Sequence, residues 1–137
     1  MQRVIFACVH NAGRSQMAAK FFSELADPAR AEAVSAGTQP GDRVHPEVVD
    51  VMREVGLDVS GARPRRLTAE LARSASLLIT MGCGDECPYV PGLRRDDWAL
   101  QDPKGLPLDE VRRIRDEIRD RVSALVDAYE WRRAAAS

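Results

Sequence analysis

Two short runs of residues are apolar on both faces, and each runs directly into a loop that contains glycine and cysteine. The first run spans Arg3–Ala7, and the second spans Leu77–Met81. A strand that is apolar on both faces belongs in the centre of a parallel sheet, because helices then cover both sides of the sheet. These two runs therefore predict a parallel sheet with helices on its two faces.

Segments with helical spacing alternate with the expected strands. We expect helices over residues 15–26, from His45-Pro46 to Gly56, from about Thr68, and from Leu108 onward. Two further strands are expected over Ala31–Ala36 and Trp98–Leu100. The alternation predicts an α/β fold: a three-layer, doubly wound sheet of about four parallel strands flanked by helices. A chain of 137 residues fits a single domain that spans residues 1–137.

Charge and hydropathy exclude several classes of function. Twenty basic residues nearly balance twenty-one acidic residues, so the net charge indicates neither a nucleic acid nor an anionic membrane as a partner. The apolar run near the N-terminus is too short for a signal peptide or a membrane span. We therefore expect a cytoplasmic protein, and we expect it to be a monomer.

The loop after the first strand indicates the function most clearly. It consists of Cys8, Val9, His10, Asn11, Ala12, Gly13, Arg14 and Ser15. Because this loop joins a strand to the start of a helix, its N–H groups can surround an oxyanion, and the helix dipole favours negative charge there. Arg14 adds a planar donor for two of the oxyanion's oxygens. The same environment favours the thiolate form of cysteine, so Cys8 is expected to be a nucleophile.

Other residues are expected to support this loop. We expect Ser15 to donate its hydroxyl to the Cys8 sulfur, Asn11 to hold the loop in place, and the turn to need the conformational freedom of Gly13. We expect the side chain of His10 to point outward. Asp102 follows the expected Trp98–Leu100 strand, and apolar neighbours can keep its carboxyl partly protonated, so it is a candidate general acid.

The sequence from Cys8 to Met17 resembles the phosphate loop of the low-molecular-weight protein tyrosine phosphatase superfamily, and specifically that of its arsenate reductase branch. The resemblance covers nearly the whole chain and includes Ser35–Thr38, Thr80–Cys83, Asp85–Pro88 and Trp98–Pro103. It implies that Cys8 attacks arsenate, that Arg14 binds it, and that Asp102 protonates the leaving oxygen. Phosphate and sulfate would compete as oxyanions, and a residual phosphatase activity is expected.

Two more cysteines favour reduction over ester hydrolysis, because reducing arsenate to arsenite needs two electrons and a pair of thiols provides them. The resemblance implies a relay in which Cys83 attacks the Cys8 sulfur and expels arsenite. Cys87 would then form a redox-active disulfide with Cys83, which thioredoxin reduces. The reverse order of Cys83 and Cys87 stays open. No tightly bound cofactor is implied.

Three alternatives remain. A mycothiol-dependent reductase is one, because Cys83 and Cys87 lie closer together than in the thioredoxin-coupled members. A low-molecular-weight tyrosine phosphatase is another, although Lys104-Gly105 stands where the phosphatases place aromatic residues. The third is a zinc-binding or arsenite-binding module that uses the three cysteines and His10, in which Arg14 would repel the metal. Ala19 stands where some relatives carry an acidic residue linked to a cation site, so that site is not carried over.

Overall fold

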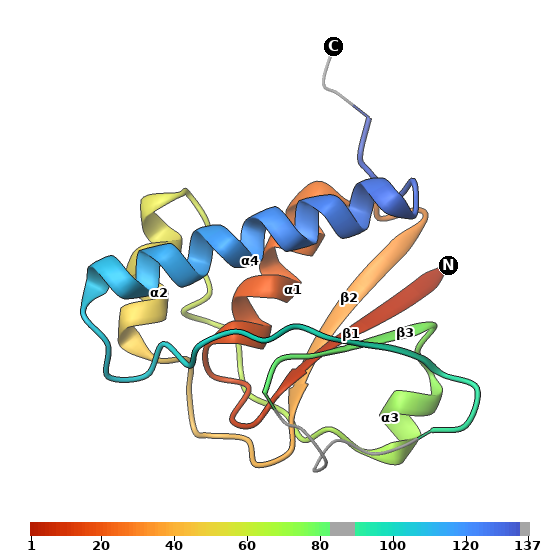
Figure 1. Cartoon of the computed structure of the whole chain (residues 1–137), viewed down its shortest axis with the longest axis horizontal. Coiled ribbons are helices and arrows are strands. Elements are labelled where there is room, and N and C mark those ends of the chain that lie inside the picture. The colour runs from red at the N-terminus through yellow and green to blue at the C-terminus, as the bar shows by residue number, and fades with distance from the viewer. Residues whose placement is uncertain (83–89, 135–137) are drawn as a thin grey trace.

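The computed structural model describes residues 1–82 and 90–134. Its helices and strands are β1 (Gln2–Cys8), α1 (Arg14–Leu25), β2 (Ala31–Gly37), α2 (Pro46–Glu54), α3 (Ala69–Arg73), β3 (Leu77–Thr80), β4 (Arg94–Asp97) and α4 (Leu108–Ala128). The strands form one parallel sheet in the order β2-β1-β3-β4. Helices α1, α2 and α4 cover one face, and α3 lies on the other (Figure 1). The predicted α/β fold is therefore confirmed.

The central strand β1 places its side chains alternately in two cores. Val4, Phe6 and Cys8 belong to the larger core beneath α1, α2 and α4. Ile5 and Ala7 belong to the smaller core on the side of α3. A strand buried on both faces needs an apolar residue at every position, which is why the first strand could be located from the sequence.

The fourth strand differs from the prediction. It was expected at Trp98–Leu100, whereas β4 consists of Arg94–Asp97 and is exposed along its whole length. β4 pairs with β3 at the edge of the sheet, and charged residues are common on edge strands because they prevent pairing with other chains. An apolar pattern cannot identify such a strand. Trp98 is instead a core residue, 5.8 Å from Phe6 between ring centroids.

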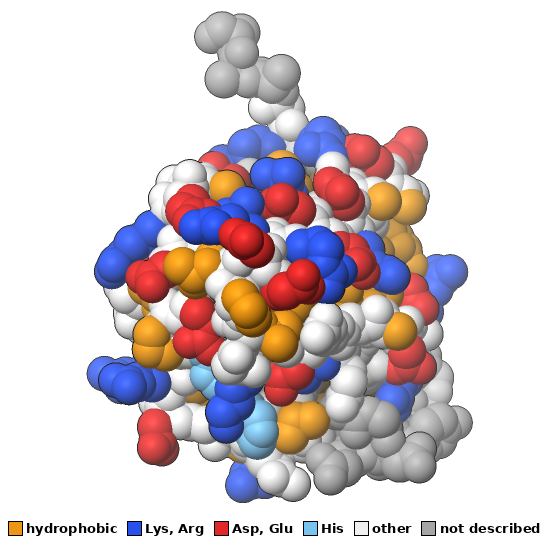
Figure 2. All heavy atoms as spheres, turned by 60° about the vertical axis from the view of Figure 1, so that its left-hand side comes forward, with side chains coloured by type: hydrophobic (Ala, Val, Ile, Leu, Met, Phe, Trp, Pro, Cys, Tyr) orange, Lys and Arg blue, Asp and Glu red, His pale blue; other side chains and the backbone are white. Residues whose placement is uncertain are grey.

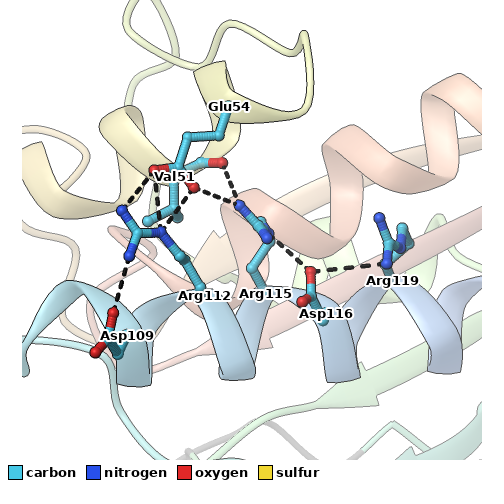
Figure 3. A network of polar contacts seen from close by, with 7 residues as sticks. All are labelled: Val51, Glu54, Asp109, Arg112, Arg115, Asp116 and Arg119. Atoms are coloured by element: carbon cyan, nitrogen blue, oxygen red, sulfur yellow. Dashed lines mark hydrogen bonds and ion pairs between the residues drawn. The ribbon is translucent and has the colours of Figure 1, made fainter.

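A network of ion pairs joins α2 to α4 (Figure 3). The guanidinium of Arg115 is largely buried and donates to the Val51 carbonyl and to Glu54 Oε1, both at 2.9 Å. Arg112 donates to both carboxylate oxygens of Glu54 at 2.8–3.0 Å. Glu54 therefore binds two arginines of α4 from the end of α2.

Within the described residues, no helix has both the length and the apolar composition of a membrane-spanning segment.

A Glu54→Gln variant is expected to show a pH-dependent loss of stability. Hydrogen bonding to Arg112, with a further bond to Arg115, lowers the pKa of Glu54 in the folded protein. A carboxyl with a lowered pKa stabilises the fold above its unfolded-state pKa, near 4.5, and this contribution disappears as the pH falls through the folded-state pKa. Melting curves followed by circular dichroism should show a Tm difference from wild type at pH 7 that shrinks below pH 4.5. A difference that does not change with pH would contradict this, and the exposed Glu24→Gln is the control.

Candidate active site

The loop of residues 8–15, called the Cys8 loop below, leaves the carboxyl end of β1 and enters α1. Its carbonyl groups accept hydrogen bonds from the segment of residues 38–45. The pairs are Thr38 N–H to Cys8 O at 3.2 Å, Gln39 N–H to Val9 O at 2.8 Å, Gly41 N–H to His10 O at 2.9 Å, and His45 N–H to Ala12 O at 2.9 Å. Among the described residues, none offers a main-chain acceptor to the N–H groups of residues 9–13. The loop thus has its carbonyls bonded and its N–H groups available to an anion.

The close approach of β2 to the Cys8 loop depends on Gly37, which is paired with Cys8 in the sheet. A Cβ at Gly37 would lie 2.6 Å from the Val9 carbonyl oxygen and 2.9 Å from the Asn11 nitrogen. No side chain fits in that space, because a Cβ needs more than 3 Å from such atoms. Gly37 therefore permits the segment of residues 38–45 to run directly alongside the loop.

Asn11 holds the Cys8 loop from inside, as the sequence predicted. It is fully buried, and its Nδ2 donates to Ser15 Oγ at 2.7 Å. Within the loop, Asn11 is the residue with left-handed backbone (φ 51°), while Gly13 has a φ of −142° and a ψ of −90°. Gly13 is also constrained by space, since a Cβ there would lie 3.0 Å from Pro103 Cγ. Asparagine tolerates the left-handed region better than most residues.

The sulfur of Cys8 lies 2.9 Å from Ser15 Oγ, and both side chains are buried. Ser15 lies in the first turn of α1, so the helix start brings its hydroxyl to the end of β1. A hydroxyl at this distance can donate a hydrogen bond to a thiolate, and this stabilises the charged form of the sulfur.

Arg14 is held by parts of the chain that are distant in sequence. Its side chain is 9% exposed, and Nη1 donates to the Leu100 carbonyl at 3.0 Å. It also passes directly beside Gly82, where a Cβ would lie 2.5 Å from Nη1. Gly82 has a φ of +101°, which glycine adopts readily. Gly82 and Leu100 were missed as site residues, although a glycine directly after a buried strand is a signal for close backbone approach.

Asp102 lies near Arg14, with 3.9 Å between Asp102 Oδ2 and Arg14 Nη2. Its other oxygen accepts from the Lys104 N–H at 3.0 Å. The expectation that apolar neighbours surround this carboxyl was wrong, because the side chain is 47% exposed. Trp98, which the sequence places among those apolar neighbours, packs into the core against Phe6. The structure thus brings Asp102 to the site, in contact with solvent.

The two histidines lie beside the Cys8 loop and not at the Cys8 sulfur. His10 points outward, as predicted, and its Nδ1 is 3.0 Å from the Gln39 carbonyl oxygen. A surface hollow of about 290 Å³ lies here, lined by His10, Ala12, Gly41, Asp42, Arg43, His45 and Lys104. Burial lowers the pKa of His45, although the carboxylates of Glu47 and Asp102 act in the opposite direction. Figure 2 shows histidine side chains beside basic ones in the lower half of this face.

Cys83 and Cys87, the two cysteines expected to complete the relay, lie outside the described residues. They are also two of the four expected ligands of the zinc-binding alternative. Among residues 1–82 and 90–134, no group of three or more His, Cys, Asp or Glu side chains is arranged to hold a metal ion.

Comparison with known proteins gives consistent results. The chain is 41% identical over 130 residues to a protein of Halobacterium salinarum named "Putative arsenate reductase", covering 90% of each chain. It is 35% identical over 129 residues to the glutaredoxin arsenate reductase of Synechocystis, covering 92% of this chain and 97% of that protein. A solved thioredoxin-dependent arsenate reductase of Corynebacterium glutamicum superposes with a TM-score of 0.82 at 38% identity. That match covers 95% of this chain but only 62% of the other.

The family assignment rests on the length of the match as well as on these relatives. The family described as low molecular weight phosphotyrosine protein phosphatase matches residues 3–134, which include β1 from Arg3 onward, the Cys8 loop and α4. The architecture agrees, because the parallel sheet, its covering helices and the loop at the end of β1 occur in one continuous match. The chain therefore belongs to the low molecular weight phosphotyrosine protein phosphatase family.

Proposed function

We propose that this protein reduces arsenate to arsenite and draws the electrons from thiols. The observation that supports this most directly is the Cys8 loop, which places a buried sulfur, N–H groups without a described main-chain acceptor and Arg14 together at the end of β1. The similarity to arsenate reductases over 90% of the chain indicates which oxyanion is the substrate.

In the first step, the Cys8 thiolate attacks the arsenic atom of arsenate. The N–H groups of the Cys8 loop and the guanidinium of Arg14 hold the remaining oxygens and balance their negative charge. One arsenic–oxygen bond breaks, and Asp102 supplies the proton with which that oxygen leaves as water. Asp102 is exposed, so solvent can return the proton. A sulfur–arsenic bond now joins the oxyanion to Cys8.

In the second step, the thiolate of Cys83 attacks the Cys8 sulfur. The sulfur–arsenic bond breaks and its electron pair stays with arsenic, so arsenic is reduced from the +5 to the +3 state and leaves as arsenite. The thiolate of Cys87 then attacks Cys83, which frees Cys8 and leaves a Cys83–Cys87 disulfide. An external thiol reductant reduces this disulfide, and we propose that this reductant is thioredoxin.

The proposal is tested by arsenate-dependent NADPH oxidation with thioredoxin and thioredoxin reductase, alongside a mycothiol-based and a glutaredoxin-based system. Wild type is expected to turn over continuously with thioredoxin. Cys83→Ser is expected to release no arsenite, whereas Cys87→Ser is expected to release one arsenite per enzyme molecule and then stop as a Cys8–Cys83 disulfide. If wild type turned over only with the mycothiol-based system, the protein would be a mycothiol-dependent reductase.

The family name favours one further candidate, a tyrosine phosphatase that uses the same loop. The Cys8 loop serves both reactions, because a phosphate ester is also an oxyanion that a thiolate can attack. Hydrolysis of an aryl phosphate, measured beside arsenate reduction, separates the two. If the aryl phosphate were hydrolysed far faster than arsenate was reduced, the phosphatase would be the correct assignment.

A further inference from the structure

Gln16 has no part in the reaction described above, yet its side chain is buried beside the Cys8 loop. It is 5% exposed near the start of α1. Its Nε2 lies 3.0 Å from the Asn11 carbonyl oxygen and 3.3 Å from Asn11 Oδ1. Both neighbours are oxygens, so only the NH₂ group of the amide can face them. The Gln16 side chain thus binds two oxygens of Asn11, the residue of the Cys8 loop that has left-handed backbone.

The main chain of Arg65 identifies which end of the Asn11 amide is the oxygen. The Arg65 N–H lies 3.0 Å from Asn11 Oδ1. A main-chain N–H can only donate, so the atom that faces it must be the amide oxygen. The Asn11 Nδ2 must then face Ser15, and it donates to Ser15 Oγ at 2.7 Å.

This orientation also determines what the Ser15 hydroxyl does. Ser15 Oγ already accepts from Asn11, and Ser15 is completely buried. Its hydroxyl hydrogen therefore needs an acceptor, and within the described residues the remaining side-chain partner of Ser15 Oγ is the Cys8 sulfur at 2.9 Å. The hydrogen bonds all run in one direction, from Gln16 and the Arg65 N–H through Asn11 and Ser15 to Cys8.

We propose that Gln16 is a positioning residue that keeps Asn11 oriented, so that Ser15 donates to the Cys8 sulfur and stabilises its thiolate. The inference rests on the assignment of Cys8 as the nucleophile. Glutamate has the shape of glutamine, but an ionised carboxylate would place oxygen against both oxygens of Asn11. Methionine keeps the length of the side chain, donates no hydrogen bond and adds no charge. The two variants therefore disturb the orientation of Asn11 to different degrees.

The test measures how fast iodoacetamide alkylates Cys8 as a function of pH, because the thiolate is the reactive form. Peptide mass spectrometry separates Cys8 from Cys83 and Cys87. In Gln16→Glu, the pH of half-maximal alkylation is expected to rise by about one unit, which is about a tenfold loss of rate at a pH below both midpoints. Gln16→Met is expected to shift the profile in the same direction by less. Gln2→Glu adds the same charge at an exposed position of β1 and should match wild type.

Wild-type alkylation profiles in both Gln16 variants would overturn the inference, even if arsenate reduction were impaired. If Gln16→Glu does not fold, as judged by circular dichroism, the profile of Gln16→Met decides the question. Alkylation needs neither arsenate nor a reductant. If wild type failed to reduce arsenate while the Gln16 variants still shifted the alkylation profile, the proposed function would be refuted and the role of Gln16 would stand.

Discussion

Arg14→Lys is expected to lower kcat/KM for arsenate by about a hundred- to a thousandfold. Arg14 uses Nη1 to bind the Leu100 carbonyl at 3.0 Å, and the rest of the guanidinium remains available to the substrate. A lysine ammonium is a compact charge without this planar fork. It can bind the Leu100 carbonyl or the oxyanion, and it cannot present two parallel donors to the oxyanion's oxygens.

Steady-state kinetics with the thioredoxin system measure this loss. Arg73→Lys is the matched control, because Arg73 is exposed on α3, on the opposite face of the sheet from α1. We expect inhibition by phosphate to weaken in Arg14→Lys as well, since phosphate presents the same tetrahedral oxygens. Kinetics within threefold of wild type would show that Arg14 does not bind the oxyanion.

Gly82→Ala is expected to lower kcat/KM by about a hundredfold, because displacing a binding group by about 1 Å is enough for such a loss. The new Cβ would lie 2.5 Å from Arg14 Nη1 and 3.3 Å from Arg14 Cζ. Arg14 would have to move away from Gly82, and its bond to the Leu100 carbonyl would be broken or lengthened. The fold itself is expected to lose only about 1 kcal/mol from the left-handed backbone at this position.

Gly92→Ala separates these two effects. Gly92 has a φ of +81°, close to the +101° of Gly82, but a Cβ there meets nothing within 4 Å. Both variants should therefore show a similar loss of unfolding free energy in urea, whereas only Gly82→Ala should show a lower kcat/KM for arsenate. If the two variants were equally active, contact with Arg14 would not be the reason for glycine at position 82.

Much of the fold was accessible from the sequence because local patterns and tertiary packing agree. From Val4 to Cys8, β1 is buried on both faces and therefore apolar, and the proline at the start of α2 suits the first turn of a helix. β4 shows the limit of this reasoning. Its residues Arg94–Asp97 are charged because the strand is an exposed edge, and its position depends on pairing with β3 rather than on its own composition.

The residues of the active site also fall into two groups, those that a local motif brings together and those that only tertiary packing brings together. Cys8, Arg14 and Ser15 lie within eight consecutive residues, so a single motif brings them together. The supporting contacts come from far away: Arg14 binds the carbonyl of a residue 86 positions later, and Asn11 accepts from an N–H 54 positions later. Such contacts depend on how the strands and helices pack, and no local spacing encodes them. Gly82 and Gln16 gained their roles only from these distances.

The bonded carbonyls of the Cys8 loop have a consequence for selectivity. Because segment 38–45 already holds the loop in shape, the anion-binding site is preformed and an anion does not have to order it. A preformed site of this kind selects anions by their size and charge, and tetrahedral phosphate resembles arsenate in both. Discrimination must then occur after entry, at the sulfur–arsenic bond, because thiols reduce arsenic(V) and leave phosphorus(V) unchanged. Selectivity in this protein would thus be a property of redox chemistry, and phosphate would bind to the site reversibly without being reduced.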